Sequence, residues 1–179
     1  MPAEAGTGGR RLVHTRRVVC QGFERDDGLW DIEAILIDTK PHDVALLERH
    51  LIPADEPIHE ITLRLAVDRS LLIHEVEVRF FHSPYQVCPS IVSSYQRLVG
   101  MPIGPGFVQA TRKLFRRTSG CTHATELIGP AASTAYQTLW NQLGSDGPFD
   151  SSSELPDFAV GGCHALGEEG VIVKRYSRG

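Results

Sequence analysis

Residues 58–82 read IHEITLRLAVDRSLLIHEVEVRFFH, and no other stretch constrains the fold as strongly. Apolar side chains recur at every second position on both sides of Asp68-Arg69-Ser70, a triplet of turn-forming character. These apolar residues are Ile61, Leu63, Leu65, Val67, Val76, Val78 and Phe80. A period of two is typical of a strand that buries one face, so the stretch predicts a β-hairpin.

A second hairpin is predicted upstream, around the turn signal Asp26-Asp27-Gly28. Residues 11–24 contain several valines and read as its first strand. Residues 29–38 read as its second strand, because apolar residues again occupy every second position. They are Trp30, Ile32, Ala34 and Leu36. Between the two hairpins, the pattern over residues 41–52 allows a short helix.

Downstream of the hairpins the apolar spacing becomes helical. Helices are predicted from Pro89 to Gly100, from Pro105 to Phe115, over residues 121–128, and from Pro130 to about Leu143. Strands followed by helices are typical of the α+β class. The sequence therefore predicts an antiparallel sheet of two hairpins, packed against the helices of the C-terminal half.

A chain of 179 residues and 19.7 kDa fits a single domain, predicted here over residues 11–179. The small polar residues 1–10 predict a disordered tail. Residues 144–157 are rich in Gly, Ser, Asp and Pro, and they predict a flexible linker. Residues 158–179 follow as a C-terminal segment, in which Val171-Ile172-Val173 predicts a strand.

The composition narrows the functional classes. Lys and Arg number 18 against 22 Asp and Glu, for a net charge of −4, so no nucleic-acid partner is expected. No apolar run reaches the length of a membrane span, and the N-terminus shows no apolar signal-peptide core. The 4 cysteines include no CxxC pair, and without an export signal they predict reduced thiols in a cytoplasmic protein.

Two cysteines, Cys88 and Cys121, each stand directly before a predicted helix start. A helix N-terminus favours the thiolate, whereas the equally weighted alternative is a small buried hydrophobic residue. His123 and Glu126 lie three positions apart on one predicted helix, and therefore on one face. The predicted catalytic set is Cys121 as the thiolate, His123 as general base and Glu126 as the group that orients His123.

The same segment could instead bind a metal. Cys88, Cys121 and His123 are donors of the kind that hold zinc or iron, with Cys163 or His164 to complete the site. The sequence does not decide whether a metal binds, or which one. The structural alternative is a cysteine in a capping turn beside a solvent-exposed His–Glu pair.

Residues of the predicted strands could hold a small anionic molecule. The candidates are His14, Arg16, His59 and Arg64. Arginine binds a carboxylate through two parallel hydrogen bonds, whereas histidines at such positions are more often satisfied core or edge residues. A basic group at 112–117 is interpreted as a solvated helix face, in preference to a contact with an anionic cofactor or nucleic acid. The chain has no GxGxxG, Walker, HExxH or GxSxG motif.

Several of these motifs together resemble a bacterial family known as domain of unknown function number 2889. The resemblance covers roughly residues 11–143. Its motifs are His14-Thr15-Arg16, RDDGLWDIE at 25–33, Asp38-Thr39-Lys40, Pro57-Ile58-His59, Arg64, Asp68, Pro84-Tyr85, Cys88, residues 95–100, Gly120-Cys121-Thr122-His123 and Glu126-Leu127. The resemblance implies no particular activity, but its His, Arg, Asp and Cys are residue types that a site requires.

The order of elements is also similar to that of NifU-type iron–sulfur scaffold proteins. Both place a hairpin first, then a cysteine at the start of a helix, then a later cysteine near another helix. This chain lacks the early Gly-Asp loop and its cysteine that those proteins have. The likeness concerns fold, and fold alone does not establish function.

Three functional hypotheses follow. The first is a small cytoplasmic bacterial enzyme that acts on a small anionic organic molecule through Cys121, His123 and Glu126. The second is a metal- or iron–sulfur-binding module that uses Cys88, Cys121 and His123. The third is a non-catalytic domain that binds a partner protein. The enzyme ranks first, because the polar residues of the motifs are more varied than a purely structural metal site requires.

Overall fold

The computed structural model has a main sheet of four antiparallel strands in the order β1-β2-β5-β6. These strands are β1 (Thr15–Glu24), β2 (Trp30–Thr39), β5 (His59–Val67) and β6 (Ile73–His82). Each predicted hairpin is present, and the two hairpins join through the pairing of β2 with β5. The structure describes residues 9–140, 155 and 159–176.

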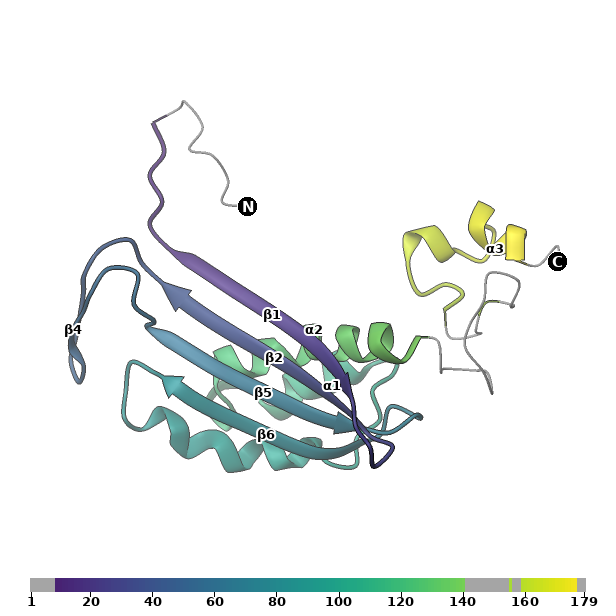
Figure 1. Ribbon diagram of the computed structural model, residues 1–179, viewed down its shortest axis with the longest axis horizontal. Helices are drawn as coiled ribbons and strands as arrows, with labels where there is room; N and C mark the ends of the chain where they lie inside the picture. Colours follow the sequence, from purple (N-terminus) through teal and green to yellow (C-terminus); the bar gives the residue numbers. More distant parts are fainter. Residues whose placement is uncertain (1–8, 141–154, 156–158, 177–179) are drawn as a thin grey trace. The chain divides into compact units, whose positions relative to one another are not determined.

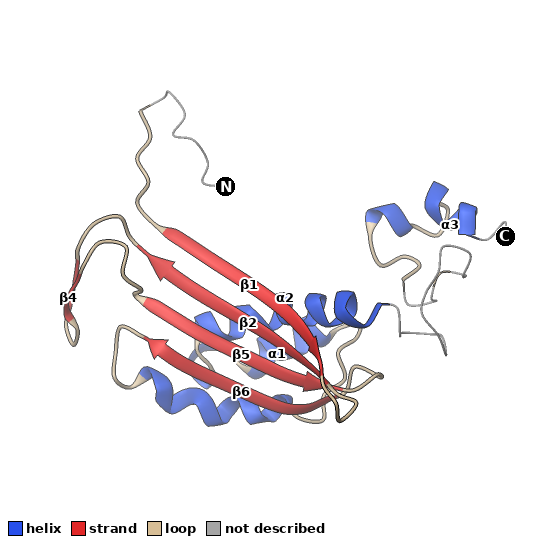
Figure 2. Cartoon of the chain, viewed as in Figure 1, coloured by secondary structure: helices blue, strands red, loops and turns tan. Residues whose placement is uncertain are grey.

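Helices cover one face of this sheet (Figure 1). They are η1 (Cys88–Leu98), α1 (Phe107–Leu114), η2 (Arg117–Ser119) and α2 (Thr122–Leu139). Figure 2 shows the same division, with β1, β2, β5 and β6 in one layer and the helices up to α2 in the other. The α+β prediction is therefore confirmed.

The core lies between these two layers, and its composition follows from the alternation in the strands. The buried strand residues include Ile32, Leu36, Ile61, Leu63, Leu65, Ile73 and Val78. The buried helix residues include Tyr95, Leu98, Phe107, Leu127, Ile128 and Ala131. Each fully buried Leu or Ile side chain stabilises the fold by about 1.5–3 kcal/mol, so the apolar faces determine which side of the sheet the helices cover.

Two predictions of local secondary structure were wrong, one for residues 41–52 and one at Pro130. Residues 41–52 contain a small hairpin, β3 (Val44–Leu46) with β4 (His50–Ile52), and not a helix. The helices predicted on either side of Pro130 are one continuous helix, α2. Pro130 is exposed, whereas its neighbours Ile128 and Ala131 are buried, so packing on both sides outweighs the missing N–H of proline.

Contacts divide the chain into two compact units, Met1–Ala135 and Tyr136–Gly179. In the second unit the segment predicted as a strand, Val171-Ile172-Val173, lies instead in helix α3 (Val171–Tyr176). The N–H of Lys174 donates to the carbonyl of Gly170, so the backbone groups bond within the helix and need no neighbouring strand. This unit also contains η4 (His164–Leu166).

Three predictions about organisation stay predictions. The predicted linker 144–157 falls, except for residue 155, outside the described residues, as does most of the predicted tail 1–10. A single domain over residues 11–179 also stays a prediction.

Among the helices of the described part, none has the length and apolarity that a bilayer crossing requires.

Candidate functional site

Neighbouring strands place charged and titratable residues side by side at one end of the main sheet. Arg16 on β1 pairs in register with Asp38 on β2, and Asp38 pairs in register with His59 on β5. All three share the parity of the buried apolar residues, so their side chains project toward the helices. His123, from the first turn of α2, and His14, just before β1, complete this group. We call these five residues the Asp38 cluster.

Asp38 is the centre of the cluster, with a side chain only 4% exposed. Its Oδ1 accepts a hydrogen bond from Nε of Arg16 at 2.8 Å, and its Oδ2 accepts one from Nη2 at 2.8 Å. His14 Nε2 lies 3.0 Å from Oδ1. Burial alone would favour the neutral acid, but the bonds and charge of Arg16, with help from His14, hold the pKa of Asp38 below its ordinary value. The carboxylate is therefore ionised at neutral pH.

His59 and His123 form a stacked pair on the other side of Asp38. Their ring centroids are 3.8 Å apart. Nδ1 of His59 lies 3.2 Å from Oδ2 of Asp38, and Nε2 of His123 lies 3.8 Å from the same oxygen. The 3.2 Å approach is not aligned as a hydrogen bond, and Nδ1 of His59 is a buried polar atom without a hydrogen-bond partner. A buried, unsatisfied nitrogen of this kind calls for an explanation.

Both imidazoles are neutral at pH 7. Burial, followed by the charge of His123, lowers the pKa of His59 from 6.5 to about 4. Burial, followed by the charge of Arg16, also lowers the pKa of His123. An ionised carboxylate thus faces two neutral imidazoles, which is the protonation state that a metal-binding site requires.

Tyr95 of η1 fixes the start of α2 and thereby positions His123. Its hydroxyl donates to the carbonyl of Cys121, accepts from the N–H of Cys121, and lies close to Oγ1 of Thr125, each at 2.9 Å. Sγ of Cys121 lies 3.9 Å from Nδ1 of His123. His123 therefore faces Cys121 with one ring nitrogen and Asp38 with the other.

Three side chains of the cluster have the donor geometry of a metal site. The ligand atoms of Asp38, His59 and His123 all lie within 4.8 Å of one another. Within residues 9–140, 155 and 159–176, this is the one group of three or more His, Cys, Asp or Glu with such spacing. Two imidazoles and one carboxylate suit zinc or ferrous iron.

Most of the site residues selected from the sequence lie at this end of the sheet. They are His14, Arg16, His59, Cys121, His123 and Glu126. Glu126 accepts a hydrogen bond from Nη1 of Arg16 at 2.5 Å. The predicted orienter of His123 is therefore tied to Arg16, and Asp38 is the carboxylate that approaches Nε2 of His123.

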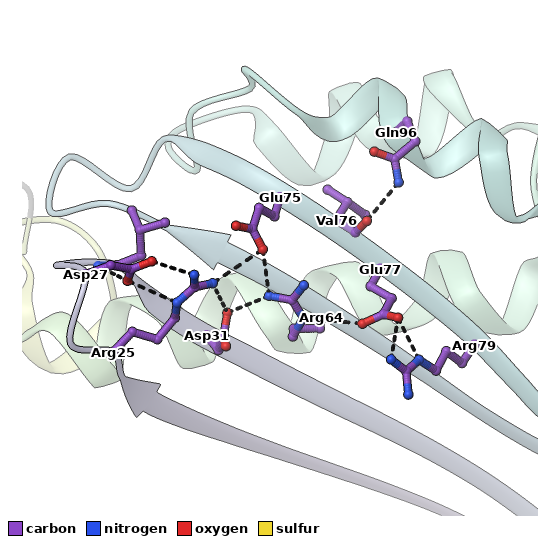
Figure 3. A network of polar contacts seen from close by, with 10 residues as sticks. Arg25, Asp27, Asp31, Arg64, Glu75, Val76, Glu77, Arg79 and Gln96 are labelled. Atoms are coloured by element: carbon purple, nitrogen blue, oxygen red, sulfur yellow. Dashed lines mark hydrogen bonds and ion pairs between the residues drawn. The ribbon is translucent and has the colours of Figure 1, made fainter.

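Arg64 lies on the opposite face of the sheet. It forms ion pairs with Asp31 at 2.8 Å, with Glu75 at 3.0 Å and with Glu77 at 3.5 Å. Figure 3 shows this network, which Arg25 extends at the end of the sheet. Three carboxylates already pair with the guanidinium of Arg64. Arg64 therefore takes no part in the Asp38 cluster, which lies on the other face of the sheet.

Cys88 stands at the start of η1, where its N–H donates to the carbonyl of Tyr85. The metal-type group found in the described residues contains His123, but neither Cys88 nor Cys121. The ligand set of Cys88, Cys121 and His123 stays a prediction.

Asp38 is the central residue that sequence reasoning missed. The sequence does contain a signal for it, because Asp38 continues the buried parity of Trp30, Ile32, Ala34 and Leu36. A carboxylate at a buried strand position must be paired or bind a ligand, since an isolated buried charge is strongly unfavourable. The same parity argument places His59 with Ile61 and Leu63 on the buried face.

Comparison with known proteins identifies a family. A family model described as "Protein of unknown function (DUF2889)" matches residues 14–137, which include every residue of the Asp38 cluster. No curated protein and no solved structure matches the chain. The likeness to NifU-type scaffold proteins therefore has no support beyond the order of elements.

Proposed function

The chain belongs to the DUF2889 family of proteins of unknown function, and we propose that it is an enzyme that binds one divalent metal ion, zinc or iron, through Asp38, His59 and His123. Its substrate would be a small organic anion. The observation that carries the proposal is the buried Nδ1 of His59, which lacks a hydrogen-bond partner and lies 3.2 Å from Asp38. Coordination of a metal would give this nitrogen a partner for its lone pair, and the nitrogen would then carry no proton.

The pairing of Asp38 with Arg16 is compatible with metal binding. A carboxylate offers about four lone-pair sites on two oxygens, and Arg16 uses one site on each oxygen. Oδ2 of Asp38, the oxygen that both histidines approach, keeps a free lone pair. Arg16 would act as an outer partner that orients the ligating carboxylate, a common role beside metal sites.

A bound divalent ion would supply a Lewis acid that polarises an oxygen of the substrate. The chain's own residues would do the rest. Arg16, fixed between Asp38 and Glu126, would hold the carboxylate of Asp38 in place. His14, with a side chain 41% exposed, would stand at the solvent side of the cluster as a further donor.

Metal content is the direct test. Protein purified without chelator, and chelated protein titrated with Zn²⁺ or Co²⁺, should bind about one ion per chain. His59→Asn should weaken binding by about 100-fold or more, because it removes an imidazole ligand. His74→Asn is the matched control, since His74 is exposed and bonded to Asp68. Binding by the His59 variant that equals wild type, or no binding by any form, would overturn the proposal.

A second candidate function uses Cys121 as a nucleophile and His123 as its base. The 3.9 Å approach of Sγ to Nδ1 of His123 supports it. In that case iodoacetamide should alkylate Cys121 at neutral pH faster than it alkylates the exposed Cys163, and His123→Gln should abolish the difference. Equal rates at the two cysteines would exclude an activated thiol. If both tests fail, the partner-binding hypothesis is the one that stands.

A further inference from the structure

A groove between α1 and α2 adjoins the Asp38 cluster. It encloses about 510 Å³, a volume that falls within the range of small-molecule sites. Its lining includes Val108, Arg112, Phe115, Arg117, Glu126 and Gly129. Glu126 belongs to both places, because it lines the groove and also binds Arg16 of the cluster.

Two cations line this groove without a carboxylate partner among the described residues. Arg112 and Arg117 form no ion pair there, whereas Arg16, Arg25 and Arg64 are each bound to carboxylates. What distinguishes Arg112 and Arg117 is that both line one groove. The lining has one acid, Glu126, which pairs with Arg16 outside the groove, so the two arginines outnumber the carboxylate. The polar wall of the groove is therefore cationic.

Gly129 lines the groove on the side of α2 and puts no side chain into it. It stands in the interior of the 18-residue helix α2, directly before Pro130, and glycine there is less favourable than alanine by about 1 kcal/mol. A Cβ built on it would meet nothing within 4 Å beyond its chain neighbours and the backbone of its own helix, so the space on this side is open. Its neighbour Pro130 disfavours a Cβ on the preceding helical residue, which is a local reason for glycine here. Its backbone is helical, so it needs no unusual φ angle. A larger side chain at this position would instead extend into the groove that Gly129 lines.

We propose that the groove binds an organic anion with an apolar body. Arg112 and Arg117 would hold its charged end, and Val108 and Pro130 would contact its apolar part. The role of the groove as the substrate site rests on the proposed function, since Glu126 and Arg16 connect it to the metal-type donors. Binding of the anion itself does not depend on a metal.

Binding of 2-naphthoate, measured by calorimetry and by amide shifts in NMR spectra of the full chain, tests this assignment. We expect one site per chain and shifts at α1 and α2. The affinity for the neutral analogue 2-naphthalenemethanol should be at least about tenfold lower, because this alcohol offers the arginines no charge. Replacement of Arg112 and Arg117 by Ala should remove this preference, whereas Arg116→Ala, a neighbouring exposed arginine outside the lining, should preserve it.

Gly129→Leu provides a second test that does not depend on charge. It should abolish naphthoate binding by filling the groove, and thermal unfolding of the same sample checks that the variant remains folded. Equal affinity for the acid and the alcohol, or unchanged binding by both groove variants, would overturn the assignment.

Zn²⁺ binding measured on the same samples separates the two proposals. Naphthoate binding without Zn²⁺ binding refutes the metal site and keeps the groove. Zn²⁺ binding without naphthoate binding refutes the groove and keeps the metal site.

Discussion

Replacing His59 by Asn should remove a large part of the acid sensitivity of the metal-free fold. Burial, followed by the charge of His123, lowers the pKa of His59 from 6.5 to about 4 in the folded chain. In the unfolded chain the imidazole titrates near its ordinary value of about 6.5. Between these two pKa values the unfolded state binds more protons than the folded state. The free energy of unfolding therefore falls as the pH is lowered from about 6.5 to about 4.

The size of this effect follows from the two pKa values. A difference between 6.5 and about 4 corresponds to about 3 kcal/mol, at roughly 1.36 kcal/mol per pH unit. The side chain of His59 is only 16% exposed, so solvent screening reduces this figure little. Asn offers an amide near the position of Nδ1 but does not titrate. The unfolding free energy of His59→Asn should thus lack this loss of about 3 kcal/mol.

Urea unfolding, followed by circular dichroism in the presence of a chelator, measures the effect at pH values across this window. As the pH is lowered through this window, the unfolding free energy of wild type should fall by about 3 kcal/mol more than that of His59→Asn. His74→Asn serves as the control, because His74 is exposed and bonded to Asp68, and its curve should keep the acid sensitivity of wild type. Parallel curves for wild type and His59→Asn would show that His59 is not held neutral by burial, and they would refute the reasoning.

Three further predictions concern stability and are read by thermal or urea unfolding. Asp38→Asn should destabilise the fold by about 3 kcal/mol at neutral pH, since charged hydrogen bonds are lost. Because the pKa of this carboxyl is lowered, the difference from wild type should shrink as the pH falls through the folded-state pKa, and a difference that does not change with pH would contradict the ion-pair explanation. Tyr95→Phe should cost about 1–3 kcal/mol because the N–H of Cys121 at the start of α2 loses its acceptor, whereas Tyr85→Phe, 46% exposed, should be neutral; equal effects would be inconsistent with this role. Gly120→Ala should cost about 1–3 kcal/mol, since its Cβ would lie 2.6 Å from the Cβ of a phenylalanine, whereas Gly104→Ala meets nothing within 4 Å; a neutral Gly120 variant would refute the clash.

Local patterns predicted the strands well, because each strand buries one face and its sequence must alternate. The bounds predicted for β2, β5 and β6 agree with the structure to within a residue or two. Predictions from local signals were weaker where packing competes with propensity. Pro130 reads as a helix start but lies inside α2, and the β-branched run at 171–173 lies in α3.

The candidate site was predicted in part. The motif Cys121-Thr122-His123 at a helix start and the strand residues His14, Arg16 and His59 were all selected from the sequence, and the structure places them at one end of the sheet. Their centre, Asp38, was not selected, although its buried parity was readable. Arg64 lies between Leu63 and Leu65 in the alternating pattern, so the sequence already predicts that it faces away from the buried side, where the structure places it.

The sequence by itself determined the two hairpins, the order of strands and helices, and the buried face of each strand, because these depend on the spacing of residues near one another in the chain. Only the tertiary structure decided which polar residues meet. Pairing of β1 with β2 and of β2 with β5 aligns Arg16, Asp38 and His59, and packing of α2 adds His123. The register of strands and the docking of a helix result from burial across the whole core, so no local pattern contains them.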